Sequence, residues 1–259
     1  MPVVTLTTDW IQDDYYSGAL KGKLITASPA VNIIDISSNI PSFNSARAAF
    51  VLKNSFTHFP AGSIHLICVN AEPGVEESIL AIEYEGHFFI GNDNGIFGLI
   101  FRNQPSAVVE LPFPEKPSGF SSLEVFVKAA SRLANGEDIS GLGKQRDGFN
   151  KSIPRRATIE EDVINGSVIY IDSYQNAITN ITRELYERIG KGRQFEVALQ
   201  SNHYKLKKIN QTYNETSVGE LLVLFNYLDL LEVAINKGNA AQLLGLDMNS
   251  VIRIRFFNK

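Results

Sequence analysis

The first half of the chain alternates uninterrupted apolar runs with segments whose apolar residues recur every three or four positions. The uninterrupted runs predict buried strands over residues 3–7, 31–36 and 64–69. Helical spacing predicts helices over residues 14–26, 43–56 and 121–135. Glu85 and Gly86 separate two further apolar runs, which predicts a hairpin. Because strand and helix alternate, we expect an α/β domain with a mostly parallel sheet flanked by helices.

The second half has a different pattern. Residues 141–157 are rich in Gly, Lys and Arg and carry no apolar periodicity. Beyond them come short apolar strands with two short helices between them, a pattern typical of a small antiparallel β-barrel. The sequence therefore predicts an N-terminal α/β domain over residues 1–150, a linker over 151–165 and a smaller C-terminal antiparallel β-barrel domain over 166–259.

Composition and charge exclude several classes of protein. The 24 basic and 28 acidic side chains give a net charge of −4 without a basic block, so we expect no nucleic-acid partner. No apolar run approaches the roughly 20 residues that cross a bilayer, so we expect no membrane partner. The single cysteine, Cys68, excludes an internal disulfide and is expected to be a buried, inert thiol. No basic segment precedes the first strand, which predicts a cytoplasmic protein without a signal peptide.

An acidic turn follows the first predicted strand and contains Asp9, Asp13 and Asp14. Ligands of open α/β sheets bind outside the carboxyl ends of the strands, which is where Asp9 lies. Its two oxygens can each accept one O–H of a ribose diol. Asp14 is better placed to cap the following helix. Three carboxylates also suit a divalent cation, as in the metal-dependent nucleoside hydrolases, so a metal site is a second interpretation of this turn.

Five segments carry motifs that occur together in one protein family. They are residues 7–22, 35–41, 90–95, 171–181 and 231–241. The fourth reads Ile-Asp-Ser-Tyr-Gln-Asn-Ala-Ile-Thr-Asn-Ile and is similar to the pattern Ile-Asp-x-Phe-Gly-Asn-x-x-Thr-Asn-Ile. The third contains Gly-Asn-Asp-Asn-Gly, similar to Gly-Pro-Asp-Asn-Gly. In this order they resemble the S-adenosylmethionine (SAM) hydroxide adenosyltransferases, or SAM hydrolases, which are related to the SAM-dependent chlorinases and fluorinases.

The resemblance implies a substrate site shared between copies of the chain. It implies a homotrimer with inter-subunit sites that take SAM or adenosine, with SAM as substrate and with no cofactor and no metal. By position, Asp9 would hold the ribose hydroxyls and Phe43 would lie near the ribose and the sulfonium. Asp172 and Asn176 would hold the methionine end or the adenine edge, and Tyr174 would stack. From the residues alone, Asn176 also reads as a turn residue and Tyr174 as a core residue.

Two family motifs are altered at their reactive residues. The hydrolases carry Asp-Pro-Gly-Val-Gly-Thr-x-Arg, where this chain has Glu72 in place of Asp and no Arg. They also carry Phe-His-Gly-Arg-Asp-x-Phe, where Ser121 replaces the His. Ser122 falls where the halogenases place a hydroxyl beside a halide, although the glutamates of the 72–77 turn would repel a halide. We therefore take Glu72, Ser121 and Ser122 as the candidate catalytic residues.

The expected function is hydrolysis of SAM at its C5′–S bond to adenosine and L-methionine. A positioned carboxylate can act as general base on water, so Glu72 would support a slow reaction. One alternative is a catalytically impaired protein that only binds SAM or adenosine, which the missing Arg and His favour. The other is a metal-dependent nucleoside hydrolase, which would release a free base.

Overall fold

A computed structural model of the protein describes residues 1–11, 13–117, 119–199 and 204–257. The chain folds into two compact units, Met1–Pro154 and Arg155–Lys259. The N-terminal unit is an α/β domain and the C-terminal unit contains a nearly closed, barrel-like antiparallel sheet. None of the helices in the described part of the chain combines the length and apolarity needed to cross a membrane.

The sheet of the N-terminal unit has seven strands in the order β2-β1-β3-β5-β4-β6-β7. Their bounds are β1 (Val3–Thr8), β2 (Asn32–Ser37), β3 (Ile64–Cys68), β4 (Ile79–Tyr84), β5 (His87–Asn92), β6 (Ala107–Glu110) and β7 (Lys144–Gln145). Strand β1 pairs in parallel with β2 and β3, and β3 pairs in parallel with β5. Cys68 is fully buried at the end of β3, and burial raises the pKa of its thiol.

The sheet is mixed, so the expectation of a mostly parallel sheet was wrong. The predicted hairpin is present, with Glu85 and Gly86 at φ of 49° and 77°, and it turns β5 back antiparallel to β4. Strands β6 and β7 then continue antiparallel beyond β4. A two-residue hairpin can only join antiparallel strands, so this turn ends the parallel half of the sheet.

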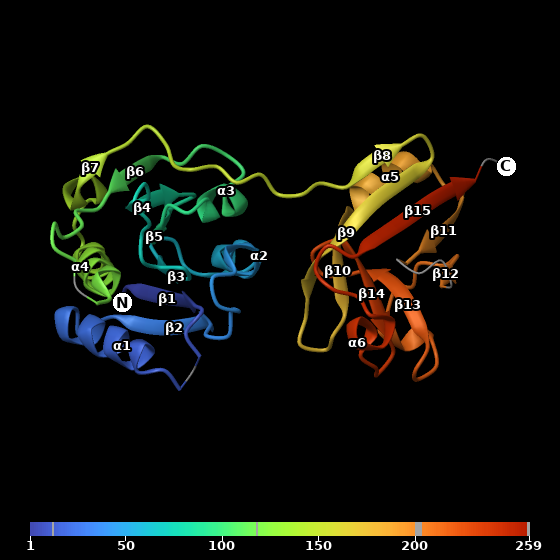
Figure 1. Cartoon of the computed structure of the whole chain (residues 1–259), viewed down its shortest axis with the longest axis horizontal. Helices are drawn as coiled ribbons and strands as arrows, with labels where there is room; N and C mark the ends of the chain where they lie inside the picture. The colour runs from blue at the N-terminus through green and yellow to red at the C-terminus, as the bar shows by residue number, and fades with distance from the viewer. Residues whose placement is uncertain (12, 118, 200–203, 258–259) are drawn as a thin grey trace. The chain divides into compact units, whose positions relative to one another are not determined.

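Helices cover both faces of this sheet, as Figure 1 shows. They are α1 (Tyr15–Ala27), α2 (Ser45–Lys53), α3 (Ile96–Ile100) and α4 (Ser121–Ala134), with short 3₁₀ turns η1 (Phe56–His58) and η2 (Ile139–Leu142). One core lies between the sheet and α1 and α4, and the other lies under α2 and α3. In α4 the predicted apolar face is buried, including Phe126 and Ala130, which are fully covered. Burial of this stripe fixes the position of the α4 N-terminus.

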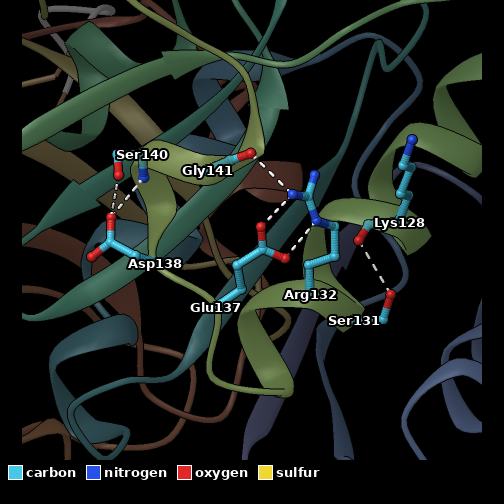
Figure 2. Close-up of polar contacts among 7 residues, drawn as sticks. All are labelled: Lys128, Ser131, Arg132, Glu137, Asp138, Ser140 and Gly141. Atoms are coloured by element: carbon cyan, nitrogen blue, oxygen red, sulfur yellow. Dashed lines mark hydrogen bonds and ion pairs between the residues drawn. The ribbon is translucent and has the colours of Figure 1, made fainter.

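The other end of α4 is tied to the chain that follows it (Figure 2). The guanidinium of Arg132 donates from Nε to Glu137 at 2.6 Å and from Nη2 to the Gly141 carbonyl at 2.9 Å. Asp138 accepts hydrogen bonds from the backbone N–H and hydroxyl of Ser140 at 2.9 and 2.6 Å. These contacts join the C-terminal end of α4 to η2, so the helix is held at both ends.

The C-terminal unit has an eight-stranded sheet ordered β12-β11-β15-β9-β10-β14-β13, with β8 also paired to β9. Its strands are β8 (Thr158–Glu160), β9 (Val163–Ile171), β10 (Ala177–Thr182), β11 (Gln194–Ala198), β12 (Lys205–Leu206), β13 (Leu221–Phe225), β14 (Leu230–Ile235) and β15 (Val251–Phe257). Its helical segments are α5 (Arg183–Gly190), η3 (Tyr213–Glu215) and α6 (Ala240–Leu244). The range expected as a linker, 151–165, overlaps β8 and the first residues of β9. Long strand β9 pairs with β15, β10 and β8 and so joins the two halves of the sheet.

Candidate functional site

Asp9 lies directly after β1, at the carboxyl edge of the parallel strands. Its Oδ2 accepts the backbone N–H of Phe43 at 2.9 Å and that of Asn70 at 3.2 Å. Both donors have left-handed backbones, with φ of 62° and 47°. Such residues cost about 1–3 kcal/mol each and persist where the surroundings hold them. One carboxylate oxygen thus holds two loops, while Oδ1 receives no hydrogen bond from the described residues.

An open depression of about 630 Å³ surrounds Asp9. Its walls are largely aromatic: Phe120 packs edge-on against Trp10 and Tyr16, with ring centroids 5.3 and 5.2 Å apart. The Tyr15 ring lies beside that of Tyr16, with centroids 4.2 Å apart and planes tilted by 34°. The Phe43 ring also lines the depression and is 74% exposed. Aromatic faces attract cations as well as planar groups, so this wall suits a cationic or planar ligand.

Glu72 lines the same depression from the loop after β3. Its Oε1 accepts the backbone N–H of Ser122 at 2.9 Å and the Ser122 hydroxyl at 2.8 Å. Ser122 is the second residue of α4, so the carboxylate sits at the positive end of this helix. Oε2 receives no hydrogen bond from the described residues. Glu72 is thus oriented through Oε1 within the lining of the depression.

The two candidate serines lie differently from Glu72. Ser121 and Ser122 are both buried and neither is among the residues that line the depression. Ser122 is brought to Glu72, and its hydroxyl is used in that contact. By the spacing of the altered motif, Ile79 stands in the place of the absent Arg, and it is buried in β4. Of the two altered motifs, the polar groups that remain here are the Glu72 carboxylate and the α4 N-terminus.

The acidic turn does not form the helix cap expected of Asp14. Asp14 occupies the N-cap position of α1, but its side chain makes no capping hydrogen bond. It instead lines the depression with Asp9. Among the described residues, no three His, Cys, Asp or Glu side chains are grouped so that they can hold a metal ion. The geometry around Asp9 favours hydroxyl ligands, since one of its oxygens is already engaged by backbone N–H groups.

The barrel-like unit has a depression of its own, of about 670 Å³. The three predicted residues Asp172, Tyr174 and Asn176 all line it. Asp172 Oδ1 accepts the backbone N–H groups of Tyr174 and Asn176 at 2.9 and 2.8 Å, and Oδ2 accepts Asn176 Nδ2 at 3.2 Å. Asp172 and Asn176 therefore shape the turn, whereas the Tyr174 ring is 76% exposed. Tyr174 is not a core residue.

Sequence reasoning missed a second tyrosine in this depression. Tyr213 lies on η3, and its hydroxyl donates to Oε1 of buried Glu232 at 2.8 Å. Asn226 donates to the other oxygen of Glu232 at 2.9 Å. Burial raises the pKa of Glu232. Glu232 belongs to the Leu-Glu-x-Ala motif of residues 231–234, but nothing in that motif indicates its partner 19 residues earlier.

Known proteins resemble the chain over nearly its whole length. Residues 4–143 match the family described as the SAM hydroxide adenosyltransferase N-terminal domain, and residues 166–253 match the C-terminal domain. The (R)-S-adenosyl-L-methionine hydrolase of Thermus thermophilus is 27% identical, covering 98% of this chain and 100% of that protein. The protein of the same name from Methanocaldococcus jannaschii is 28% identical, with 98% and 96% covered.

Solved structures agree in fold. An uncharacterized conserved protein from Thermotoga maritima superimposes with a TM-score of 0.87 at 24% identity, covering 98% of this chain and 99% of that one. A conserved hypothetical protein from Thermus thermophilus gives 0.78 at 25% identity, with 99% and 100% covered. With both family domains matched in order around the motifs that form the two depressions, the chain belongs to the SAM hydroxide adenosyltransferase family.

Proposed function

We propose that the protein hydrolyses S-adenosyl-L-methionine at the C5′–S bond, and that its substrate is the (R) form named for its relatives. The observation that carries this is that Asp9 and Glu72 line one aromatic depression, each with a carboxylate oxygen that no described residue engages. Asp9 accepts the ribose hydroxyls, which places C5′ and the sulfonium between the rings and Glu72. The products are adenosine and L-methionine.

The reaction needs little from the protein beyond positioning and proton removal. A water oxygen attacks C5′ in line with the C5′–S bond, and the bonding electron pair moves to sulfur, which leaves as the neutral thioether of methionine. The water proton passes to Glu72 Oε2. A general base contributes about 10²–10⁴-fold, and fixed geometry adds to this. Without the family's Arg and His, we expect slower turnover than in a hydrolase with the full set.

We further propose that the substrate site is completed by a second copy of the chain in a homotrimer. Two incomplete depressions support this, one in each unit, and each carries a highly exposed aromatic ring, Phe43 or Tyr174. Large exposed rings around a depression are typical of surfaces that are covered in an assembly. In this arrangement Tyr174 and Tyr213 of the neighbouring copy enclose the adenine.

The test is to incubate the protein with (R)-SAM and with (S)-SAM and to separate the products by chromatography. We expect adenosine and methionine in equal amounts from (R)-SAM, and no such products from Asp9→Ala under the same conditions. Heat of SAM binding without product would select the catalytically impaired binding protein. Release of adenine, with loss of activity in a chelator, would select the nucleoside hydrolase. Either result contradicts the proposal.

A further inference from the structure

Asn92 occupies a buried position behind the candidate site. It ends β5 and is 1% exposed. Its Nδ2 lies 3.0 Å from the Asn70 carbonyl, 3.3 Å from the Glu72 carbonyl and 2.7 Å from Oε2 of Glu77. One amide group thus contacts the main chain of two residues that line the depression: Asn70, which donates to Asp9, and Glu72, which carries the candidate base.

Glu77 completes this arrangement from the other end of the loop. Its Oε2 accepts the backbone N–H of Gly74 at 2.9 Å in addition to the Asn92 amide. Both donors use the same oxygen, so the contact closes residues 72–77 into a compact turn. Buried polar side chains with several such partners rigidify the segments they join.

The two residues are also both departures from the motifs quoted above. Asn92 stands where the pattern Gly-Pro-Asp-Asn-Gly has Pro, and Glu77 stands where Asp-Pro-Gly-Val-Gly-Thr-x-Arg has Thr. In that same segment Ile79 stands in the place of Arg. A proline has no side-chain donor and a threonine does not reach as far as a glutamate, so the Asn92–Glu77 contact is a feature of this chain's own sequence.

We propose that Asn92 and Glu77 are positioning residues for the reaction. They hold the 70–77 loop in one conformation, so that Asp9 and Glu72 keep a fixed position relative to each other. This contact takes the place of the family-motif side chains that the segment lacks. Neither touches the reacting atoms. The inference rests on the proposed function, because what these residues position is the Glu72 carboxylate relative to the attacking water. A displacement of about 1 Å in such a group can cost about 10²-fold in rate.

Three variants at neighbouring positions test this. Glu77→Ala removes the shared oxygen, and we expect kcat for adenosine release to fall about 10- to 100-fold with KM within roughly twofold of wild type. Glu77→Gln keeps a carbonyl oxygen for both donors and is expected to retain most of kcat. Glu76→Ala is the matched control, because that side chain is exposed and makes no hydrogen bond among the residues that the structure describes. Two further variants test the coupling: Asn92→Ala and the double variant Glu77→Ala/Asn92→Ala, which should lose no more kcat than the worse of its two single variants.

A charge effect of Glu77 on the sulfonium would make Glu77→Gln as slow as Glu77→Ala, and that result would overturn the inference. So would wild-type kcat in Glu77→Ala. A second readout does not depend on turnover: amide hydrogen exchange at Gly74, Asn70 and Ser122 should speed up in Glu77→Ala and not in Glu76→Ala. Unchanged exchange contradicts the positioning role. Absence of adenosine from wild type with the expected exchange pattern would overturn the proposed function alone.

Discussion

At the residue scale, the two oxygens of Asp9 have separate tasks. Oδ2 holds the loops of Phe43 and Asn70, whose backbones are left-handed, and we propose that Oδ1 accepts the ribose hydroxyls. Asp9→Asn can keep the backbone contacts through its carbonyl oxygen, but then offers an NH₂ group that cannot accept a hydroxyl. Because hydrogen bonds to charged groups contribute about 1.5–3 kcal/mol, the dissociation constant of adenosine should rise about 10- to 100-fold. Calorimetry measures this; unchanged affinity would show that Asp9 does not contact the nucleoside.

Glu72 also combines two roles, and two substitutions separate them. Glu72→Gln still accepts from Ser122 through its amide oxygen but cannot take a proton, so kcat should fall about 10²- to 10⁴-fold at unchanged thermal stability. Glu72→Ala also leaves the α4 N-terminus without its acceptor and should lower unfolding stability by about 1 kcal/mol in a urea titration. Full turnover in Glu72→Gln would remove Glu72 from the reaction.

The site residues differ in how far the sequence could reveal them. Asp9 and Glu72 follow predicted strands, so their place at the carboxyl edge of the sheet followed from the chain order. Ser122 was taken as a candidate catalytic residue, and its hydroxyl donates to Glu72, a contact that the motif did not indicate. Tyr213 and Asn92 escaped notice because their partners, Glu232 and Glu77, lie 19 and 15 residues away and meet them only in the folded chain.

At the element scale, three strands share a buried polar chain. Thr5 on β1 lies 2.7 Å from Nδ1 of His65 on β3, and His65 Nε2 lies 3.2 Å from Nδ1 of His87 on β5. Burial first, and then the neighbouring His87, lower the pKa of His65 to about 3. Burial likewise lowers the pKa of His87. These histidines are therefore neutral in the folded protein near neutral pH.

This network predicts a defined sensitivity to acid. A histidine whose pKa is lowered in the folded state binds its proton preferentially in the unfolded chain. Its contribution to the free energy of unfolding is therefore complete above the unfolded pKa of about 6.5, and it is lost as the pH falls toward the folded pKa of about 3. His65 alone should reduce the free energy of unfolding by about 1.4 kcal/mol per pH unit in this window. Urea titrations at pH 7 and pH 5 should show a smaller loss for His65→Gln than for wild type. Equal losses would contradict a neutral buried His65.

The elements themselves were predicted more completely than their pairing. Apolar runs identified β1, β2 and β3, and helical spacing identified α1 and α4 within a few residues. These runs did not show whether neighbouring strands pair in parallel or antiparallel, because a strand that leads into a hairpin and one that leads into a crossover have the same apolar pattern. The turn at Glu85 and Gly86 was predicted. The antiparallel pairing of β4, β6 and β7 was not, because it depends on which edge of the sheet each strand joins.

At the scale of the whole molecule, the proposal of shared sites makes a prediction about mixed assemblies. Asp9→Ala damages the N-terminal depression and Tyr174→Ala damages the barrel depression, so each variant alone should be nearly inactive. The two variants are co-expressed in equal amounts with different tags. One shared site in four then combines an intact N-terminal depression with an intact barrel depression, so about a quarter of wild-type activity should return. Mixing purified, non-exchanging variants is the control. No recovery on co-expression would place each site within one chain.

The most direct measurement of the central claim is the fate of the oxygen atom. If water attacks C5′ of (R)-SAM, then reaction in H₂¹⁸O should give adenosine with one ¹⁸O atom at its 5′-hydroxyl and methionine without label, as read by mass spectrometry. Unlabelled adenosine, or no adenosine at all, would contradict hydrolysis at the C5′–S bond.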